Sequence, residues 1–193
     1  MADYLDKKFI NKLRQDYHQR EEERKEIIER SNKILHASKR VIFSLHREEI
    51  EKAEQNLADI EKDLQELEES FGFKRLVEEG SFKAAAEEYT EAKMFSLVLA
   101  GEKLGQVKEV KLSLDSYIGG MCDLTGELVR RATNKAASGK TEEAKKIKEM
   151  ISAIMEELIQ LDLTGYLRNK FDQAKTSLKK IEQMEYEINL KKQ

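Results

Sequence analysis

The chain has 193 residues and a formal net charge of −3, and 38% of its residues are charged. It contains no proline, no tryptophan and nine glycines, and Leu, Ile, Glu, Lys and Ala dominate, which is typical of long helices rather than of sheets. The absence of an eighteen-residue apolar run or a signal-peptide core excludes a membrane span, and the single cysteine, Cys122, favours a reducing, cytoplasmic location.

Helix-breaking signals divide the chain into a few long segments. Glycines and short polar stretches occur at 70–73, 80–81, 101–105, 137–141 and 163–165. The predicted helices cover residues 3–47, 48–69, 81–100, 113–136, 141–161 and 164–190, with a short helical piece at 74–79. Ser81 and Thr141 are predicted to cap their helices. We therefore predict an all-α fold, one domain over residues 1–193, built as a bundle of six to seven helices with a long first helix.

The first predicted helix has apolar side chains at its two ends and none in its middle. The N-terminal end carries Tyr4, Leu5, Phe9, Leu13 and Tyr17, and the C-terminal end carries Ile, Val and Leu residues between positions 27 and 45. The segment "HQREEERKE" lies between them. A helix that is polar all round at its middle bridges separate packing surfaces or bends into solvent. The pattern therefore favours self-association.

Charge is distributed unevenly along the chain. Residues 1–47 hold about twelve basic and eight acidic side chains, whereas residues 48–80 hold about twelve acidic and four basic ones. A chain that is acidic overall still binds a polyanion if one face collects its cations. A solvated helix surface with i,i+4 ion pairs is the commoner origin of such a pattern, and both interpretations stay open here.

The helix predicted at 81–100 places carboxylates in line with apolar residues. The steps of four and three give a seam of Ala84, Glu88, Glu91, Phe95 and Val98. Glu87 lies off this seam. Because an unpaired buried carboxylate costs several kcal/mol, Glu88 and Glu91 need a paired arginine, a shared proton or a metal ion. A structural salt bridge to a neighbouring helix is the alternative to a site.

The helix predicted at 113–136 carries a second pair of acids. Asp123 and Glu127 are one turn apart, opposite an apolar stripe, and Gly119 and Gly126 lie on their side. Each glycine costs about 1 kcal/mol in a helix interior, so close approach of a backbone or substrate is expected there. Two helices with two carboxylates each are suited to Mg²⁺ or Mn²⁺, with Arg130 as a helper. An exposed acidic face is the alternative.

Other candidate residues give weaker signals. Cys122 has no visible catalytic partner and is more typical of a small core residue. His36 and His46 are as compatible with a buried, hydrogen-bonded histidine as with a ligand contact. No histidine completes a Glu-x-x-His motif, so a di-iron oxidase is disfavoured. No glycine-rich phosphate loop, nucleophile elbow or zinc spacing is present.

Four segments of the chain are similar to segments of one known protein family. "DSYIGGMCDLTGELVRRATN" (115–134) resembles the family segment D-Y-L-x-G-x-x-D-L-T-G-E-L-x-R. "SKRVIFSLHR" (38–47) resembles S-K-R-x-I-F-x-L-H-R, and "EEYTEA" (87–92) resembles Q-E-Y-V-E-A. "SLKKIEQMEYEI" (177–188) fits the last helix of the family. The family that these segments resemble is the translin family. Translin proper lacks this set of acids, so the resemblance favours the nuclease members, known as translin-associated factor X.

The resemblance implies a fold, an assembly and an activity. It implies an all-helical protein that forms hollow octameric barrels, here a homo-octamer, and binds RNA and single-stranded DNA. It also implies a Mg²⁺-dependent endoribonuclease whose metal-binding and catalytic acids match Glu88, Glu91, Asp123 and Glu127. The short loop before residue 115, and a first helix without a preceding basic segment, indicate an archaeal homologue.

The leading functional hypothesis is metal-dependent cleavage of RNA. Lys39, Arg40 and Arg47 are predicted to guide the RNA backbone through salt-sensitive contacts, and Arg130 or Arg131 to neutralise developing charge. One alternative is a non-catalytic nucleic-acid-binding shell in which the acids only organise the fold. Another is a helical adaptor that binds protein alone, which predicts no salt-dependent affinity for RNA.

Overall fold

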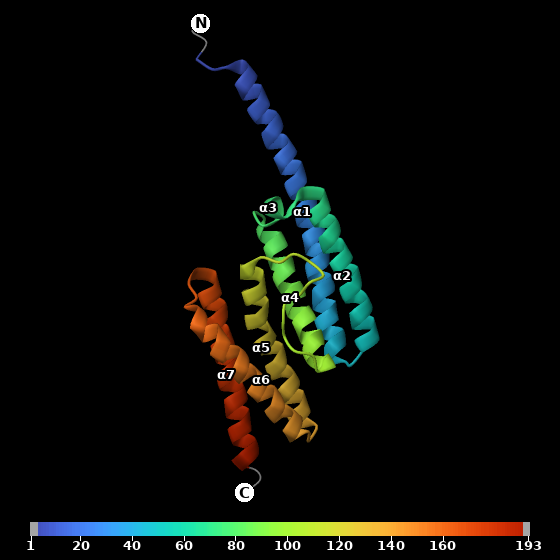
Figure 1. Ribbon diagram of the computed structural model, residues 1–193, viewed down its shortest axis with the longest axis vertical. Coiled ribbons are helices and arrows are strands. Elements are labelled where there is room, and N and C mark those ends of the chain that lie inside the picture. Colours follow the sequence, from blue (N-terminus) through green and yellow to red (C-terminus); the bar gives the residue numbers. More distant parts are fainter. Residues whose placement is uncertain (1–3, 191–193) are drawn as a thin grey trace.

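Helix α1 (Lys7–His46) is the longest element of the chain and extends beyond the other helices at its N-terminal end (Figure 1). The structure, a computed structural model, describes residues 4–190. The predicted helix start at residue 3 and the ends of the predicted domain, 1–3 and 191–193, lie outside the described residues. Asp6 begins α1 by accepting hydrogen bonds from the backbone N–H groups of Lys8 and Phe9.

The remaining elements are helical as predicted, and the described part of the chain contains no strand. After α1 come α2 (Ile50–Phe71), α3 (Phe73–Leu76), α4 (Gly80–Ala100), α5 (Leu114–Ala137), α6 (Thr141–Leu158), the short 3-10 helix η1 (Ile159–Leu161) and α7 (Gly165–Leu190). Gly72, Gly101, Gly139 and Gly165 have positive φ angles at or beside four of the breaks, whereas the turn between α1 and α2 contains no glycine and Glu48 takes the positive φ there. The all-α prediction is confirmed.

Two predicted caps are wrong by one or two residues. The N-cap of α4 is Glu79 and that of α6 is Lys140, and neither side chain makes a capping hydrogen bond. Ser113, in contrast, caps α5 by accepting a hydrogen bond from the N–H of Ser116. The preference of serine and threonine for N-cap positions therefore located these helix starts to within two residues but did not identify the capping residues themselves.

Helix α4 lies at the centre of the bundle and is buried on several sides. It packs against α1, α2 and α5, while α5 also packs against α6 and α7 (Figure 1). The fully buried side chains of Tyr89 and Phe95 in α4 belong to one continuous core with Leu45 of α1, Leu64 of α2 and Leu124 of α5. None of the helices in residues 4–190 is apolar over a stretch long enough to cross a bilayer.

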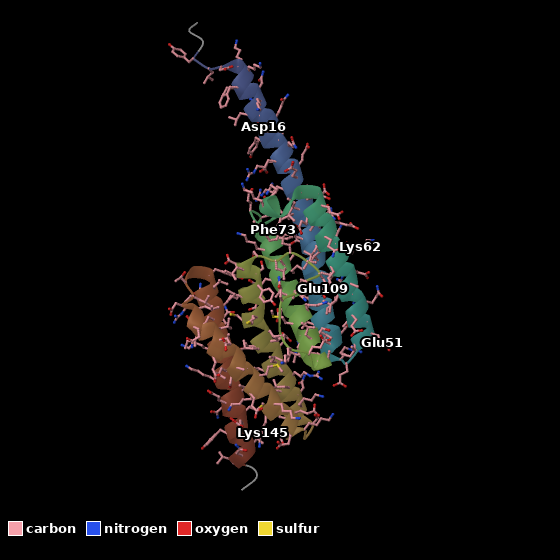
Figure 2. All side chains as sticks on the ribbon, viewed as in Figure 1. Asp16, Glu51, Lys62, Phe73, Glu109 and Lys145 are labelled. Atoms are coloured by element: carbon pink, nitrogen blue, oxygen red, sulfur yellow. The ribbon has the colours of Figure 1, made fainter. Side chains whose placement is uncertain are left out.

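The two halves of α1 have different environments. From Ile27 onward its apolar residues are mostly buried in the bundle, whereas Phe9, Leu13 and Tyr17 are each more than half exposed. Figure 2 shows Asp16 on this projecting part, away from the other helices. The apolar N-terminal stripe therefore packs against nothing within the described part of its own chain.

Candidate metal and nucleic-acid site

Helices α4 and α5 approach closely where two glycines of α5 face α4. A Cβ atom on Gly120 would lie 2.8 Å from the carbonyl oxygen of Glu87 and 2.7 Å from the Cβ of Thr90. A Cβ on Gly119 would overlap the Glu87 carboxylate. The predicted close approach is therefore present at Gly119. No described atom of a neighbouring element lies within 4 Å of a Cβ on Gly126, so helix packing does not explain that glycine.

This contact brings five carboxylates together. Those of Glu87 and Glu91 are buried, with residue exposures of 7%, and the other three are partly buried. They are Glu87, Glu88 and Glu91 of α4 and Asp123 and Glu127 of α5. All four predicted acids thus belong to one cluster. The prediction that Glu87 lies off the buried face is wrong, because α4 has more than one buried face.

One end of the cluster is neutralised by α7. The ammonium of Lys170 lies 2.5 Å from Oδ2 of Asp123 and 2.6 Å from Oε1 of Glu87. The hydroxyl of Tyr166 donates a hydrogen bond to the same Glu87 oxygen over 2.7 Å. These two carboxylates hold the pKa of Lys170 above its usual range, although burial acts in the opposite direction. The sequence analysis missed Lys170 and Tyr166.

The other end of the cluster meets α1. Nε2 of His46 lies 2.5 Å from Oε2 of Glu127, and this hydrogen bond holds the pKa of Glu127 below its usual value. The His46 side chain is 5% exposed and packs against Phe95 with ring centroids 4.8 Å apart. Lys39 lies 3.9 Å from Glu88, too far for a hydrogen bond. His46 is thus the buried, hydrogen-bonded histidine that was one of its two sequence interpretations.

Glu91 lies between these two ends without a cation of its own. Within residues 4–190 its carboxylate has no hydrogen-bond or ion-pair partner. Burial, followed by the charges of Asp123, Glu88 and Glu127, raises the pKa of Glu91 to about 9. Burial also raises the pKa of Glu88 and of Asp123, despite the lysines beside them. The centre of the cluster therefore lacks positive charge.

The donor set fits a hard divalent cation in its chemistry, but the side chains do not yet form a coordination shell. Carboxylate oxygens are the ligands that Mg²⁺ and Mn²⁺ prefer, and the buried, unpaired Glu91 is stabilised by a cation. Across residues 4–190, no three His, Cys, Asp or Glu side chains converge closely enough to hold an ion where they stand. Rotation of Glu88, Glu91 and Glu127 is required, so the predicted ligand set stays a prediction.

The five predicted RNA-binding residues lie in different environments. Lys39 and Arg40 are exposed on α1, and Arg47 stacks over the exposed Phe43 ring at 5.6 Å while pairing with Glu49. These three residues form a basic strip toward the C-terminal end of α1, and its Lys39 comes within 3.9 Å of Glu88 in the acidic cluster. On α5, the exposed Arg130 lies 3.4 Å from Glu127, as predicted for a helper of the acids.

Arg131 lies away from the acidic cluster. Its guanidinium is 3.4 Å from Glu48 at the turn between α1 and α2, and its side chain is only 16% exposed. Lys135 joins the same carboxylate at 3.2 Å. Arg131 therefore ties α5 to that turn, and Arg130 is the better placed of the two to meet a bound phosphate.

Cys122 has a structural role. It is buried next to Asp123, and burial raises the pKa of its thiol to about 12. A thiol that stays protonated at neutral pH is a poor nucleophile. The sequence interpretation of Cys122 as a small core residue is confirmed.

Comparison with known proteins gives one family and several solved structures. The model of the Translin family matches residues 22–192. The chain is similar to apo-NeC3PO, with a TM-score of 0.80 and 23% identity over 95% of this chain and 96% of that one. It is also similar to AfC3PO in complex with duplex RNA, with a TM-score of 0.78 and 24% identity over 90% of this chain and 93% of that one. The match to AfC3PO has a TM-score of 0.80 and 22% identity over the same shares of the two chains. No curated protein sequence matches it.

Proposed function

The chain belongs to the translin family, and from that premise we propose that it is a Mg²⁺-dependent endoribonuclease of the translin-associated factor X type. The single observation that carries this proposal is the buried Glu91 carboxylate, which has three further carboxylates around it and no cation partner among the described residues. Without a cation this carboxyl group holds a proton at neutral pH, because its pKa is raised to about 9. A divalent cation would take the place of that proton and stabilise the charged carboxylate.

The residues of the cluster divide the chemical work. Glu88, Glu91, Asp123 and Glu127 would hold the ion, with Mn²⁺ able to replace Mg²⁺. A bound divalent cation supplies a more acidic water and a charge opposite the scissile phosphate. A carboxylate of the set would take the proton of the attacking water as the water oxygen bonds to phosphorus and the P–O3′ bond breaks. The 3′ oxygen would take a proton from solvent water, which leaves a 5′-phosphate and a 3′-hydroxyl. Arg130 lies at the rim, where it meets the charge that develops on the phosphate.

The basic strip of Lys39, Arg40 and Arg47 is the proposed path of the RNA backbone. It lies toward the C-terminal end of α1, and its Lys39 lies 3.9 Å from Glu88. AfC3PO, a similar structure, has been solved with duplex RNA, which supports a polyanionic ligand for this chain as well. Single-stranded DNA offers the same phosphates. Binding is expected to weaken steeply as salt increases, because phosphate contacts release counterions.

Self-association is proposed through the projecting part of α1. Its exposed stripe of Phe9, Leu13 and Tyr17 has no packing partner within residues 4–190, and a second copy of the chain would bury it. A closed homo-octamer would place the acidic clusters in one enclosed space. The cytoplasmic location and the archaeal origin stay predictions.

A cleavage assay tests the proposal. RNA oligonucleotides, single-stranded and duplex, are incubated with the assembled protein in Mg²⁺ and in excess EDTA. We expect cleavage in Mg²⁺ only, and a loss of at least about 100-fold in E91A, because several kcal/mol of transition-state stabilisation depends on the held ion. E69A, which removes an exposed acid of α2, is the matched control. Size-exclusion chromatography verifies that both variants assemble.

The second candidate is a non-catalytic RNA-binding shell. The observations in its favour are that Lys170 already neutralises one end of the cluster, that His46 hydrogen-bonds Glu127 at the other end, and that the described acids form no three-ligand group. Salt-dependent RNA binding without cleavage in any divalent metal would establish this shell. RNA affinity that is absent at both low and high salt would instead leave the protein-binding adaptor.

A further inference from the structure

Lys170 occupies a position that is enclosed by side chains of three helices. Its ammonium, on α7, lies between a carboxylate of α4 and a carboxylate of α5, and its side chain is 17% exposed. Gly119 leaves the room that the Glu87 carboxylate needs, and Tyr166 donates to the same carboxylate. A surface lysine that drifts against an acidic patch has no such supports. The Lys170 ammonium is therefore a fixed component of the cluster.

The geometry around this nitrogen resembles that of a bridging cation. One oxygen from Glu87 and one from Asp123 converge on it at 2.6 and 2.5 Å. In two-metal nucleases and phosphatases, the second ion lies about 3.5–4 Å from the first and is held by shared carboxylates in the same way. Here the corresponding place, in the same cluster as the unpaired Glu91, holds a positive charge that belongs to the protein.

We propose that Lys170 takes the place of a second divalent cation, so that each chain binds one metal ion, held on the Glu88, Glu91 and Glu127 side of the cluster. The inference rests on the proposed metal centre. It makes Lys170 a positioning residue, which orients Asp123 and neutralises Glu87 without itself touching the ion. It also explains why five carboxylates can surround one divalent ion: Lys170 neutralises Glu87 and part of Asp123, and His46 hydrogen-bonds Glu127.

Mn²⁺ binding to the assembled full chain tests the inference directly. Calorimetric titration, with electron paramagnetic resonance of free Mn²⁺ as a second readout, gives the number of ions per chain. We expect one ion for the wild type. K170M keeps the side-chain stem but removes the charge, which leaves Glu87 and Asp123 facing an empty position, so we expect two ions. K170M/E87Q, which also lacks one ligand of that position, is expected to return to one.

Matched variants separate a specific effect from a general one. K175M removes another α7 lysine, which lies over Phe171, and we expect it to bind one ion. K170Q serves if K170M fails to fold by circular dichroism. Two ions in the wild type, or one ion in a folded K170M, would overturn the inference while leaving a metal centre in place. No Mn²⁺ binding by the wild type would instead overturn the proposed function, and the inference with it.

Discussion

Two charge clusters lie on opposite sides of α4, and they share one arrangement of partners. On the α2 side, the ammonium of Lys93 lies 2.8 Å from Glu61 and 3.0 Å from Glu109, and the Tyr89 hydroxyl donates to Glu61. Figure 2 places Glu109 on this side, where its carbonyl accepts a hydrogen bond from Gln65 of α2. On the α5 side, the Lys170 ammonium likewise lies between Glu87 and Asp123, and the Tyr166 hydroxyl donates to Glu87.

The difference between the clusters is the charge that remains. The α2-side cluster is complete, because each of its two carboxylates has the shared ammonium and a hydrogen bond besides. The α5-side cluster adds three more acids and leaves Glu91 without a cation partner in residues 4–190. Buried charge by itself therefore identifies no site. What sets the α5-side cluster apart is that its deeply buried Glu91 has no cation partner among the described residues.

The largest expected effect comes from breaking the complete cluster. K93M leaves two carboxylates without their cation, and we expect the free energy of unfolding to fall by about 3 kcal/mol. This value is at the lower end of the range for breaking a buried ion pair, because Glu109 is partly exposed. Urea denaturation measures the loss. Mn²⁺ should restore more stability in K170M than in K93M, because the position vacated in K170M belongs to a cluster with three further acids, whereas the position vacated in K93M has two acids alone. K62M, at an exposed α2 pair 3.8 Å apart, is the control and should change stability by less than about 0.5 kcal/mol.

The next effect concerns how the second cluster is assembled. In G120A the added methyl group meets the Glu87 carbonyl and the Thr90 side chain, so α4 and α5 must separate. Overpacking of this kind costs about 2–3 kcal/mol. Mn²⁺ affinity should fall as well, because the acids of the two helices move apart. A variant that unfolds at the wild-type urea concentration would show that the helices yield easily and that their spacing does not set the site.

The third prediction reverses the usual direction of a mutation. E91Q removes a carboxyl group that must take up a proton when the metal-free chain folds at neutral pH, so the metal-free protein should become more stable by about 1–2 kcal/mol while losing metal-dependent cleavage. Because the pKa of Glu91 is raised to about 9, its folded form holds a proton that the unfolded form releases above about pH 4.5. Wild-type stability therefore declines between about pH 4.5 and 9. The advantage of E91Q should be larger at pH 8 than at pH 5; an equal advantage at both would contradict the burial argument.

Much of the fold follows from the sequence because helix breakers are rare in it. With no proline and nine glycines, most breaks coincide with a glycine, the α1–α2 turn at Glu48 being an exception, and the predicted helices agree with α1–α7 within a few residues. Periodicity also identified Asp123 and Glu127 on one face of α5. Glu87 was missed because a seam describes a helix with one buried face, and α4 is packed by α1, α2 and α5.

The partners of the acids could not be predicted in this way. Lys170 lies 47 residues beyond Asp123 in sequence, and no spacing rule connects them. Gly119 carried a signal, since a glycine inside a helix requires a reason, and the reason proved to be the carboxylate of Glu87. His46 was recognised as a candidate, but only the packing of α1 against α4 and α5 decides between a ligand and a hydrogen-bonded histidine.

The smallest expected effect comes from Gly126, which precedes Glu127 in α5 but faces open space. If no bound partner or RNA needs the space beside Gly126, G126A should stabilise the protein by about 1 kcal/mol. Alanine is the better helix former, and its Cβ would contact no neighbouring atom. Urea denaturation of G126A beside G120A measures the contrast, and we expect the two variants to change stability in opposite directions. Mn²⁺ stoichiometry should be unchanged in G126A, because no ligand moves. A more stable G126A that binds metal normally but binds RNA more weakly would mean that the open space beside the acids is where the phosphate backbone comes closest to α5.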